Sequence, residues 1–196
     1  MAASVLFAFG RIALTEYNVA LSALLVSGFH CLLRTTEMVS LRWCQIALGD
    51  NHCGVVSLPW TKGGQRRGAR EMCTLDDPFL GRLLKVVANR QLPQNLICPS
   101  GDRHLRLFFQ RANAQLGFAA SFYKPYSLRR GGATHDYMSN KNLAKTILRG
   151  RWSELKTARV YINDGLATLN CLNLSPHQNA VIAHHAAVFE QLLTSL

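Results

Sequence analysis

The sequence lacks the features of a disulfide-stabilised or membrane-spanning protein. Its six cysteines are scattered, and no two of them have C-x-x-C spacing. Several lie within apolar runs, which is typical of buried free thiols and does not indicate a disulfide framework. The uncharged run from Asn18 to Leu33 is short and contains Ser27, Gly28 and His30. It therefore predicts a buried helix and no membrane span.

A secretion signal is also absent. Residues 1–10 are apolar, but they lack the basic region that precedes the apolar core of a signal peptide. Free cysteines indicate a reducing compartment. We therefore expect an intracellular protein, nuclear or cytoplasmic, that does not bind a membrane.

Patterns of metal ligands are missing as well. His177, His184 and His185 lie close together in the sequence, but their spacing matches no common ligand set. We expect no metal site and no cofactor.

Acidic residues are scarce. The chain has 11 Asp and Glu against 22 Lys and Arg, which gives a formal net charge of +11. Only three basic residues precede Lys62 and none follows Arg159, so the middle of the chain is a cationic block. Such a block predicts a polyanionic partner. Nucleic acid is favoured over a membrane surface because the charges alternate with loops and aromatics. A solvated basic face without a partner is the alternative.

The residues that are present predict one folded domain, 1–196, that is mainly α with a small antiparallel β-sheet (α+β). Hydrophobic residues make up 48% of the 196 residues and charged ones 17%. Periodicity and capping signals predict the elements. The expected helices cover 19–33 (one helix or two, given Gly28), 34–41, 77–89, 106–116, a segment beginning near Arg129, 142–148, 154–162 and 176–193, and the expected strands cover 45–48, 55–60 and 71–75.

The last helix, within 175–196, carries an apolar stripe. Ile182, Ala186, Phe189 and Leu193 fall on one face. This face suits either packing on the core or docking on a partner.

Three stretches bring charge into apolar surroundings. Arg34 ends an uncharged run, and Glu37 follows one turn later, which favours an i,i+3 ion pair. Arg129 and Arg130 precede two glycines at a helix start, where backbone and guanidinium groups can approach a phosphate. The third stretch runs from Gly150 to Tyr161. Taken alone, a surface salt bridge explains the first stretch equally well, and a lone tyrosine on a helix, as in the third, is usually a core or rim residue.

Together, the order of these residues resembles the tyrosine recombinase (phage integrase) family. Its pattern has Arg-x-x-Glu, a lysine in a β-hairpin, a (His/Lys/Tyr)-x-x-Arg element, Gly-x-Trp and a tyrosine nine residues later. The resemblance covers the chain from Leu14 to the final helix. The matching positions are Arg34, Glu37, Lys62, Tyr126 (usually histidine), Arg129, Trp152 and Tyr161.

The resemblance implies a specific chemistry without a metal. Tyr161 would attack a DNA phosphodiester to give a 3′-phosphotyrosyl intermediate. Arg34 and Arg129 would clamp the non-bridging oxygens, and Lys62 would protonate the leaving oxygen. Trp152 and Tyr126 would support the phosphate or Tyr161, and Glu37 would support Arg34. Other basic side chains would contact the DNA backbone, namely Arg66, Arg67, Lys124, Arg130, Lys145, Arg149 and Arg151.

The resemblance also implies partners and alternatives. Double-stranded DNA is the expected partner, with homo-oligomers forming on DNA through the C-terminal helix. The expected function is DNA recombination or integration of a mobile element, and a type IB topoisomerase shares the chemistry. Family members normally carry an N-terminal core-binding domain, which we expect to be missing from this chain. The alternatives are an inactive, mobile-element-derived DNA-binding domain and an interaction domain whose final helix docks on a partner.

Overall fold

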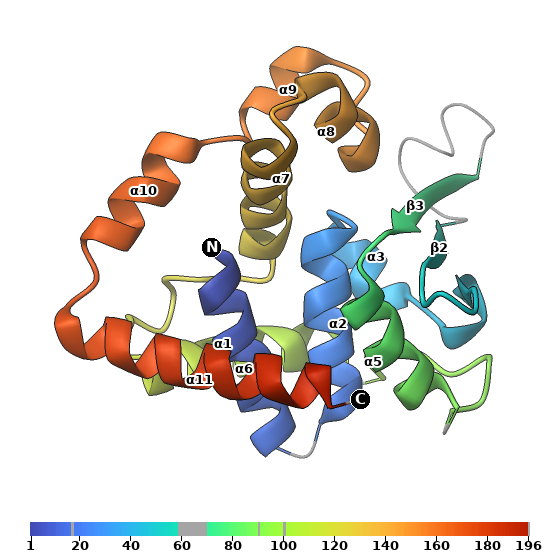
Figure 1. Ribbon diagram of the computed structural model, residues 1–196, viewed down its shortest axis with the longest axis horizontal. Helices are drawn as coiled ribbons and strands as arrows, with labels where there is room; N and C mark the ends of the chain where they lie inside the picture. Colours follow the sequence, from blue (N-terminus) through green and yellow to red (C-terminus); the bar gives the residue numbers. More distant parts are fainter. Residues whose placement is uncertain (17, 59–69, 90, 100, 196) are drawn as a thin grey trace.

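The computed structural model describes residues 1–16, 18–58, 70–89, 91–99 and 101–195. Over these residues the chain is mostly helical with one small antiparallel sheet, which confirms the predicted fold class (Figure 1). The helices are α1 (Ala3–Thr15), α2 (Val19–His30), α3 (Thr35–Ser40), η1 (Trp43–Gln45, a 3-10 turn), α5 (Pro78–Ala88), α6 (Gly101–Gln115), α7 (Tyr126–Asn140), α8 (Leu143–Gly150), α9 (Leu155–Arg159), α10 (Asp164–Leu172) and α11 (Pro176–Thr194).

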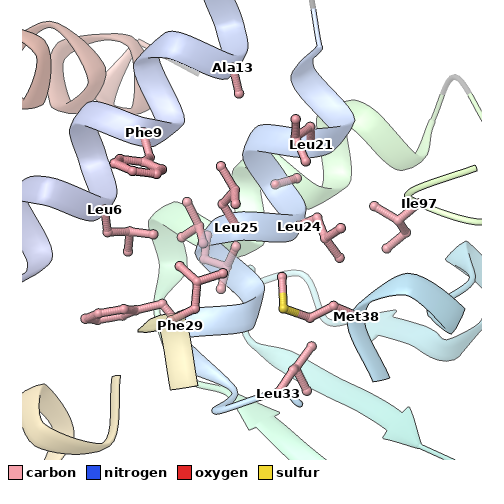
Figure 2. Close-up of a cluster of buried hydrophobic side chains, with 14 of the residues drawn as sticks. Leu6, Phe9, Ala13, Leu21, Leu24, Leu25, Phe29, Leu33, Met38 and Ile97 are labelled. Atoms are coloured by element: carbon pink, nitrogen blue, oxygen red, sulfur yellow. The ribbon is translucent and has the colours of Figure 1, made fainter. Parts of the chain in front are cut away.

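Helix α2 forms the centre of the core (Figure 2). Asn18 caps it by accepting a hydrogen bond from the Leu21 backbone nitrogen, three residues after Thr15, which ends α1. Its residues are buried on all sides because α1, α3, α5 and α7 surround it. Gly28 lies inside the helix and does not divide it. Because α2 reaches the base of the candidate site, its packing fixes where the following residues, from Cys31 to Arg34, lie.

Helix α1 was not predicted from the sequence. Its residues are buried on several faces because α1 lies between α2 and α11 (Figure 1). Helix α1 carries few polar residues, and such a helix shows little of the 3.6-residue polar periodicity by which helices are recognised.

Helix α11 packs its apolar stripe against the same chain. Ile182, Ala186, Phe189 and Leu193 are buried, and Phe189 contacts Phe7 of α1 with ring centroids 5.7 Å apart. The stripe therefore belongs to the core, which is one of the two alternatives predicted from the sequence. The face expected to contact another protomer is occupied within the chain.

The sheet has the order β1–β2–β3 and is antiparallel throughout. Its strands are β1 (Ile46–Leu48), β2 (Gly54–Leu58) and β3 (Glu71–Leu75), and Leu58 pairs with Glu71. In β3 the alternate residues Glu71, Cys73 and Leu75 are buried. The hairpin tip predicted to carry Lys62, Arg66 and Arg67 lies outside the described residues.

Two boundaries near the C-terminal third differ from the prediction. Helix α9 ends at Arg159, so Tyr161 lies in the following turn and not on the expected helix 154–162. The chain leaves the helix because Asn163 caps a further helix, α10, by accepting from the Leu166 backbone nitrogen. Helix α10 was not predicted from the sequence.

The described residues contain no membrane-spanning helix, no metal-ligand cluster and no disulfide. No helix within them is long and apolar enough to cross a membrane. No group of three or more potential ligand side chains lies together there in a way that could hold a metal ion. All six cysteines are described, and none forms a disulfide.

Replacing Phe189 with Ala tests whether α11 belongs to the core. Phe189 is fully buried, so Phe189→Ala should lower the free energy of unfolding by about 3–5 kcal/mol, as measured by urea denaturation. Leu192→Ala on the same helix removes a side chain that is 40% exposed and should cost only about 0.5 kcal/mol. Equal losses in the two variants would contradict this packing.

Candidate functional site

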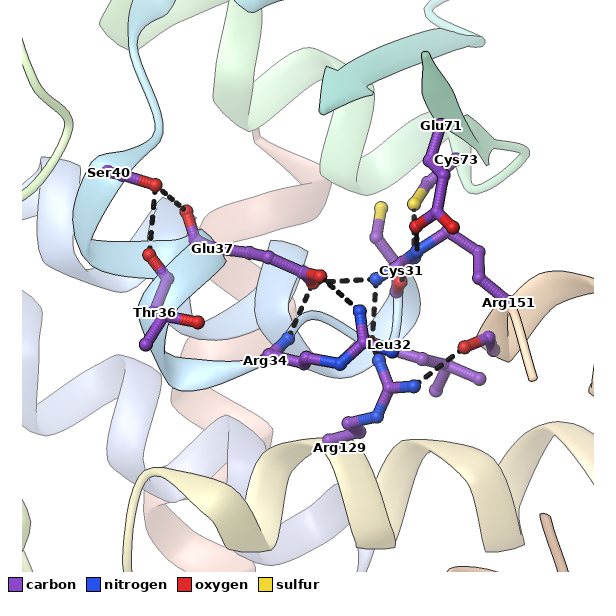
Figure 3. Close-up of polar contacts among 11 residues, drawn as sticks. Cys31, Leu32, Arg34, Thr36, Glu37, Ser40, Glu71, Cys73, Arg129 and Arg151 are labelled. Carbon is purple, nitrogen blue, oxygen red and sulfur yellow. Dashed lines mark hydrogen bonds and ion pairs between the residues drawn. The ribbon is translucent and has the colours of Figure 1, made fainter. Parts of the chain in front are cut away.

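The site begins at the N-terminus of α3, where Arg34 and Glu37 are joined twice. The Arg34 backbone nitrogen donates to Glu37 Oε2 at 2.8 Å, and Arg34 Nη1 donates to Oε1 at 2.6 Å. The predicted i,i+3 ion pair is therefore present (Figure 3). The Glu37 side chain is buried, whereas that of Arg34 is partly exposed. The Arg34 guanidinium can thus reach a ligand while the buried Glu37 carboxylate holds it in place.

Arg129, near the start of α7, is fully buried. Its guanidinium donates to two backbone carbonyls, that of Leu32 through Nη1 and that of Gly150 through Nη2, the latter at 2.6 Å. Burial, followed by the nearby charges of Arg151 and Arg34, lowers the pKa of Arg129 to about 10. Arg129 is therefore still a cation at neutral pH, and it joins the end of α2 to the end of α8.

Aromatic rings cover the Arg129 guanidinium. Its Cζ lies 4.8 Å from the ring centroid of Trp152 and 5.2 Å from that of Tyr161. The Trp152 and Tyr161 centroids are 4.9 Å apart. The Trp152 indole nitrogen is buried and has no hydrogen-bond partner among the described residues. An unpaired buried donor costs free energy, so this N–H is an unsatisfied donor in the structure.

In the tripeptide Gly150-Arg151-Trp152, the Arg151 and Trp152 side chains point in different directions. A Cβ on Gly150 would overlap the Trp152 ring, so only glycine permits this packing. Arg151 has the left-handed conformation, with φ 56° and ψ 36°, which costs a non-glycine residue about 1–2 kcal/mol. Trp152 then packs with Leu32, Ala133 and Ala158 in a small second core. This core sets the position of the ring above Arg129.

The main chain of Tyr161 is attached to α7 through Thr134. The Thr134 hydroxyl lies 3.1 Å from the Arg130 carbonyl oxygen and 3.2 Å from the Tyr161 carbonyl oxygen, the two acceptors for its single proton, and it accepts from the Asn163 backbone nitrogen at 3.2 Å. Thr134 is buried. Sequence reasoning did not single out Thr134, because a threonine within a helix gives no local signal that it binds a distant turn.

Tyr126 is the first residue of α7 and lies beside Tyr161. Their ring centroids are 5.5 Å apart. Burial, and then a side-chain hydrogen bond with Tyr161, raise the pKa of Tyr126 to about 12. Tyr126 therefore keeps its proton at neutral pH and can donate a hydrogen bond at this site.

Two arginines predicted to contact DNA are used inside the protein. Arg149 pairs through two nitrogens with Asp76, lies 3.6 Å from Asp136 and donates to the His30 carbonyl. The hydrogen bond with Asp76 raises the pKa of Arg149. The Arg151 side chain is 5% exposed and pairs with buried carboxylates. Neither side chain occupies the surface position expected from the sequence.

The other predicted positions are divided between the site and the surface. Six lie in the site around Arg129, namely Arg34, Glu37, Tyr126, Arg129, Trp152 and Tyr161. Lys124 and Lys145 are exposed and Arg130 is half-buried. The surface near the site therefore keeps basic side chains that a polyanion can reach.

Arg129→Ala tests the internal role of this guanidinium. The change leaves the Leu32 and Gly150 carbonyls without their donor, so it should lower the free energy of unfolding by about 2–4 kcal/mol. The neighbouring change Arg130→Ala should alter it by no more than about 0.5 kcal/mol. Chemical denaturation of both variants measures the difference, and a stable Arg129→Ala protein would show that the two carbonyls do not depend on it.

Comparison with known proteins supplies a structural relative. No protein-family model and no curated protein sequence matches the chain. Among solved structures, it is similar to the XerH site-specific recombinase bound to its difH substrate in a pre-cleavage complex, with a TM-score of 0.65 and 16% identity. The alignment covers 89% of this chain and 53% of the XerH chain.

A second XerH structure, the post-cleavage complex with palindromic difH, gives a TM-score of 0.63 at 16% identity and the same 89% coverage of this chain. The chain spans about half the length of these recombinase chains. It therefore has a tyrosine recombinase-like fold, similar to the catalytic domain of XerH.

Proposed function

We propose that this chain binds double-stranded DNA and cleaves and rejoins a strand through a 3′-phosphotyrosyl intermediate on Tyr161. The observation that carries the proposal is the position of the Tyr161 ring, which lies against the Arg129 guanidinium and the Trp152 ring. Site-specific recombination and integration of a mobile element are the two uses of this chemistry that we propose.

The described residues supply the parts that phosphoryl transfer to tyrosine requires. Arg34 and Arg129 bring two permanent positive charges, and the Trp152 N–H is an unused donor beside them. Fixed donors of this kind stabilise the charge that develops on non-bridging oxygens. As the Tyr161 oxygen bonds to phosphorus, its phenol proton passes to solvent and the bond from phosphorus to the 5′-oxygen breaks. Lys62, which lies outside the described residues, would give the leaving 5′-oxygen a proton. One ester replaces another, so rejoining needs no energy source.

DNA binding at Arg129 requires a change in the position of the rings that cover its guanidinium. Trp152 and Tyr161 cover the guanidinium, and both outer nitrogens are bonded to carbonyls. A phosphate reaches Arg129 when the Tyr161 side chain turns aside and the scissile group takes its place. Tyr126, still protonated, then donates either to the phosphate or to the Tyr161 oxygen.

Trapping of a covalent adduct tests the assignment of the nucleophile. With a nicked suicide DNA substrate, the wild-type chain should form an adduct that migrates with the protein on a denaturing gel. Tyr161→Phe should form none, because the attacking oxygen is gone. Tyr137→Phe removes a hydroxyl from α7, outside the residues placed in the site, and serves as the matched control.

The outcomes of this test separate the candidate functions. An adduct that persists in Tyr161→Phe would remove Tyr161 from its role. Duplex binding without an adduct under any condition would instead indicate an inactive DNA-binding domain. Relaxation of supercoiled plasmid by the wild type would indicate a type IB topoisomerase.

The salt dependence of duplex binding tests the basic surface. Neutralised phosphates release counterions, so log Kd should rise linearly with log salt concentration. Lys145 is exposed on α8, and Lys145→Ala should weaken binding and reduce the slope by about 1 if it contacts a phosphate. A slope near zero for the wild type would contradict backbone binding.

A further inference from the structure

Arg151 has a backbone conformation that arginine does not favour. It follows α8 in the left-handed region, where glycine is the least strained residue. This turn sends the Arg151 side chain away from the Trp152 ring and toward α3 and β3. The contacts that the side chain makes there offset the backbone strain.

The Arg151 guanidinium lies between two buried carboxylates (Figure 3). Its Nη2 donates to Glu37 Oε2 at 2.6 Å, and its Nε is 3.3 Å from Glu71 Oε2 in an ion pair. Its Nη1 also donates to the Cys31 carbonyl at 3.0 Å. The side chains of all three ions are between 4% and 7% exposed. Buried charges of this kind persist only when they are paired, and removing one leaves the others unbalanced.

Glu37 connects Arg151 to the phosphate-binding side of the site. One carboxylate oxygen holds Arg34 Nη1, and the other holds both the Arg34 backbone nitrogen and Arg151 Nη2. The orientation of the carboxylate therefore decides where the Arg34 guanidinium lies. Because Arg151 fixes that carboxylate, its effect reaches Arg34 without contact with a ligand.

Arg151 also joins three segments that are distant in the sequence. Glu37 belongs to α3, and Glu71 opens β3 directly after the segment that contains Lys62. Trp152, the next residue, covers Arg129 and contacts Tyr161. A shift of Arg151 would move the first arginine relative to the nucleophile.

We propose that Arg151 is a positioning residue that holds Arg34 through Glu37 and ties the α3 and β3 segments to the Trp152–Tyr161 segment. The inference rests on the proposed function. It replaces the phosphate contact that the sequence predicted for Arg151, because a side chain that is 5% exposed and paired with two carboxylates does not face DNA.

Two variants test the role. Arg151→Gly removes the side chain and suits the left-handed backbone, and Arg151→Lys keeps one charge but cannot bridge both carboxylates. Single-turnover adduct formation on suicide DNA should slow by about 10²-fold in Arg151→Gly, since small misplacements of a catalytic group have effects of this size. Arg151→Lys should recover part of the rate.

Duplex affinity separates positioning from contact with DNA. The Kd and its salt slope should stay at wild-type values in both variants. Lys145→Ala should show the signature of a phosphate contact instead, with a weaker Kd and a salt slope reduced by about 1. The time course gives the rate constant, and its amplitude gives the fraction of active protein. A loss of folded protein therefore lowers the amplitude and leaves the rate constant unchanged. If Arg151→Gly fails to fold, Arg151→Lys carries the comparison.

Each other result overturns a defined claim. A wild-type rate constant in the variants, with only a reduced amplitude, would make Arg151 merely structural. A weaker Kd with a salt slope reduced by about 1 would make it a phosphate contact. If the wild type forms the adduct and the Arg151 variants give either of these two results, this inference alone is overturned. If the wild type forms no adduct, the proposed function is overturned and this inference with it.

Discussion

Glu37 is a buried carboxylate shared by two guanidinium groups, and the geometry of the candidate site depends on it. A carboxylate in this environment is stable only with its cationic partners in place. Arg34 and Arg151 meet that need from opposite sides. The same contact therefore determines where Arg34 is held and how closely α3 approaches the end of α8. Arg129 completes the arrangement by bonding the carbonyls at the ends of α2 and α8.

The local features of this arrangement could be predicted from the sequence. The Arg34–Glu37 pair follows from i,i+3 spacing, and the cap of α5 follows from Asp77 before Pro78. Strand β3 has the predicted bounds because its alternation is regular. The resemblance to a family brought Arg129, Trp152 and Tyr161 into one hypothesis, and the structure places their side chains together.

The features that were not predicted all depend on long-range contacts. A surplus of basic residues does not reveal which arginines are buried, so Arg149 and Arg151 were expected at the surface. Their partners Asp76 and Glu71 lie far away in the sequence. Helix α1 was not predicted because neighbours enclose it, and α10 because its cap, Asn163, gave a signal too short to separate it from loop.

Thr134 contacts the main chain on both sides of this turn, whereas the phenol ring of Tyr161 is held by neighbouring rings, by Arg129 and by a side-chain hydrogen bond with Tyr126. Access to the buried cation is therefore controlled by rotation about two side-chain bonds. Rotamer exchange of this kind breaks no backbone hydrogen bond, so it is much faster than local unfolding. Under the proposed function, the covered and uncovered forms of Arg129 interchange within one folded backbone, and a duplex need only select between side-chain orientations.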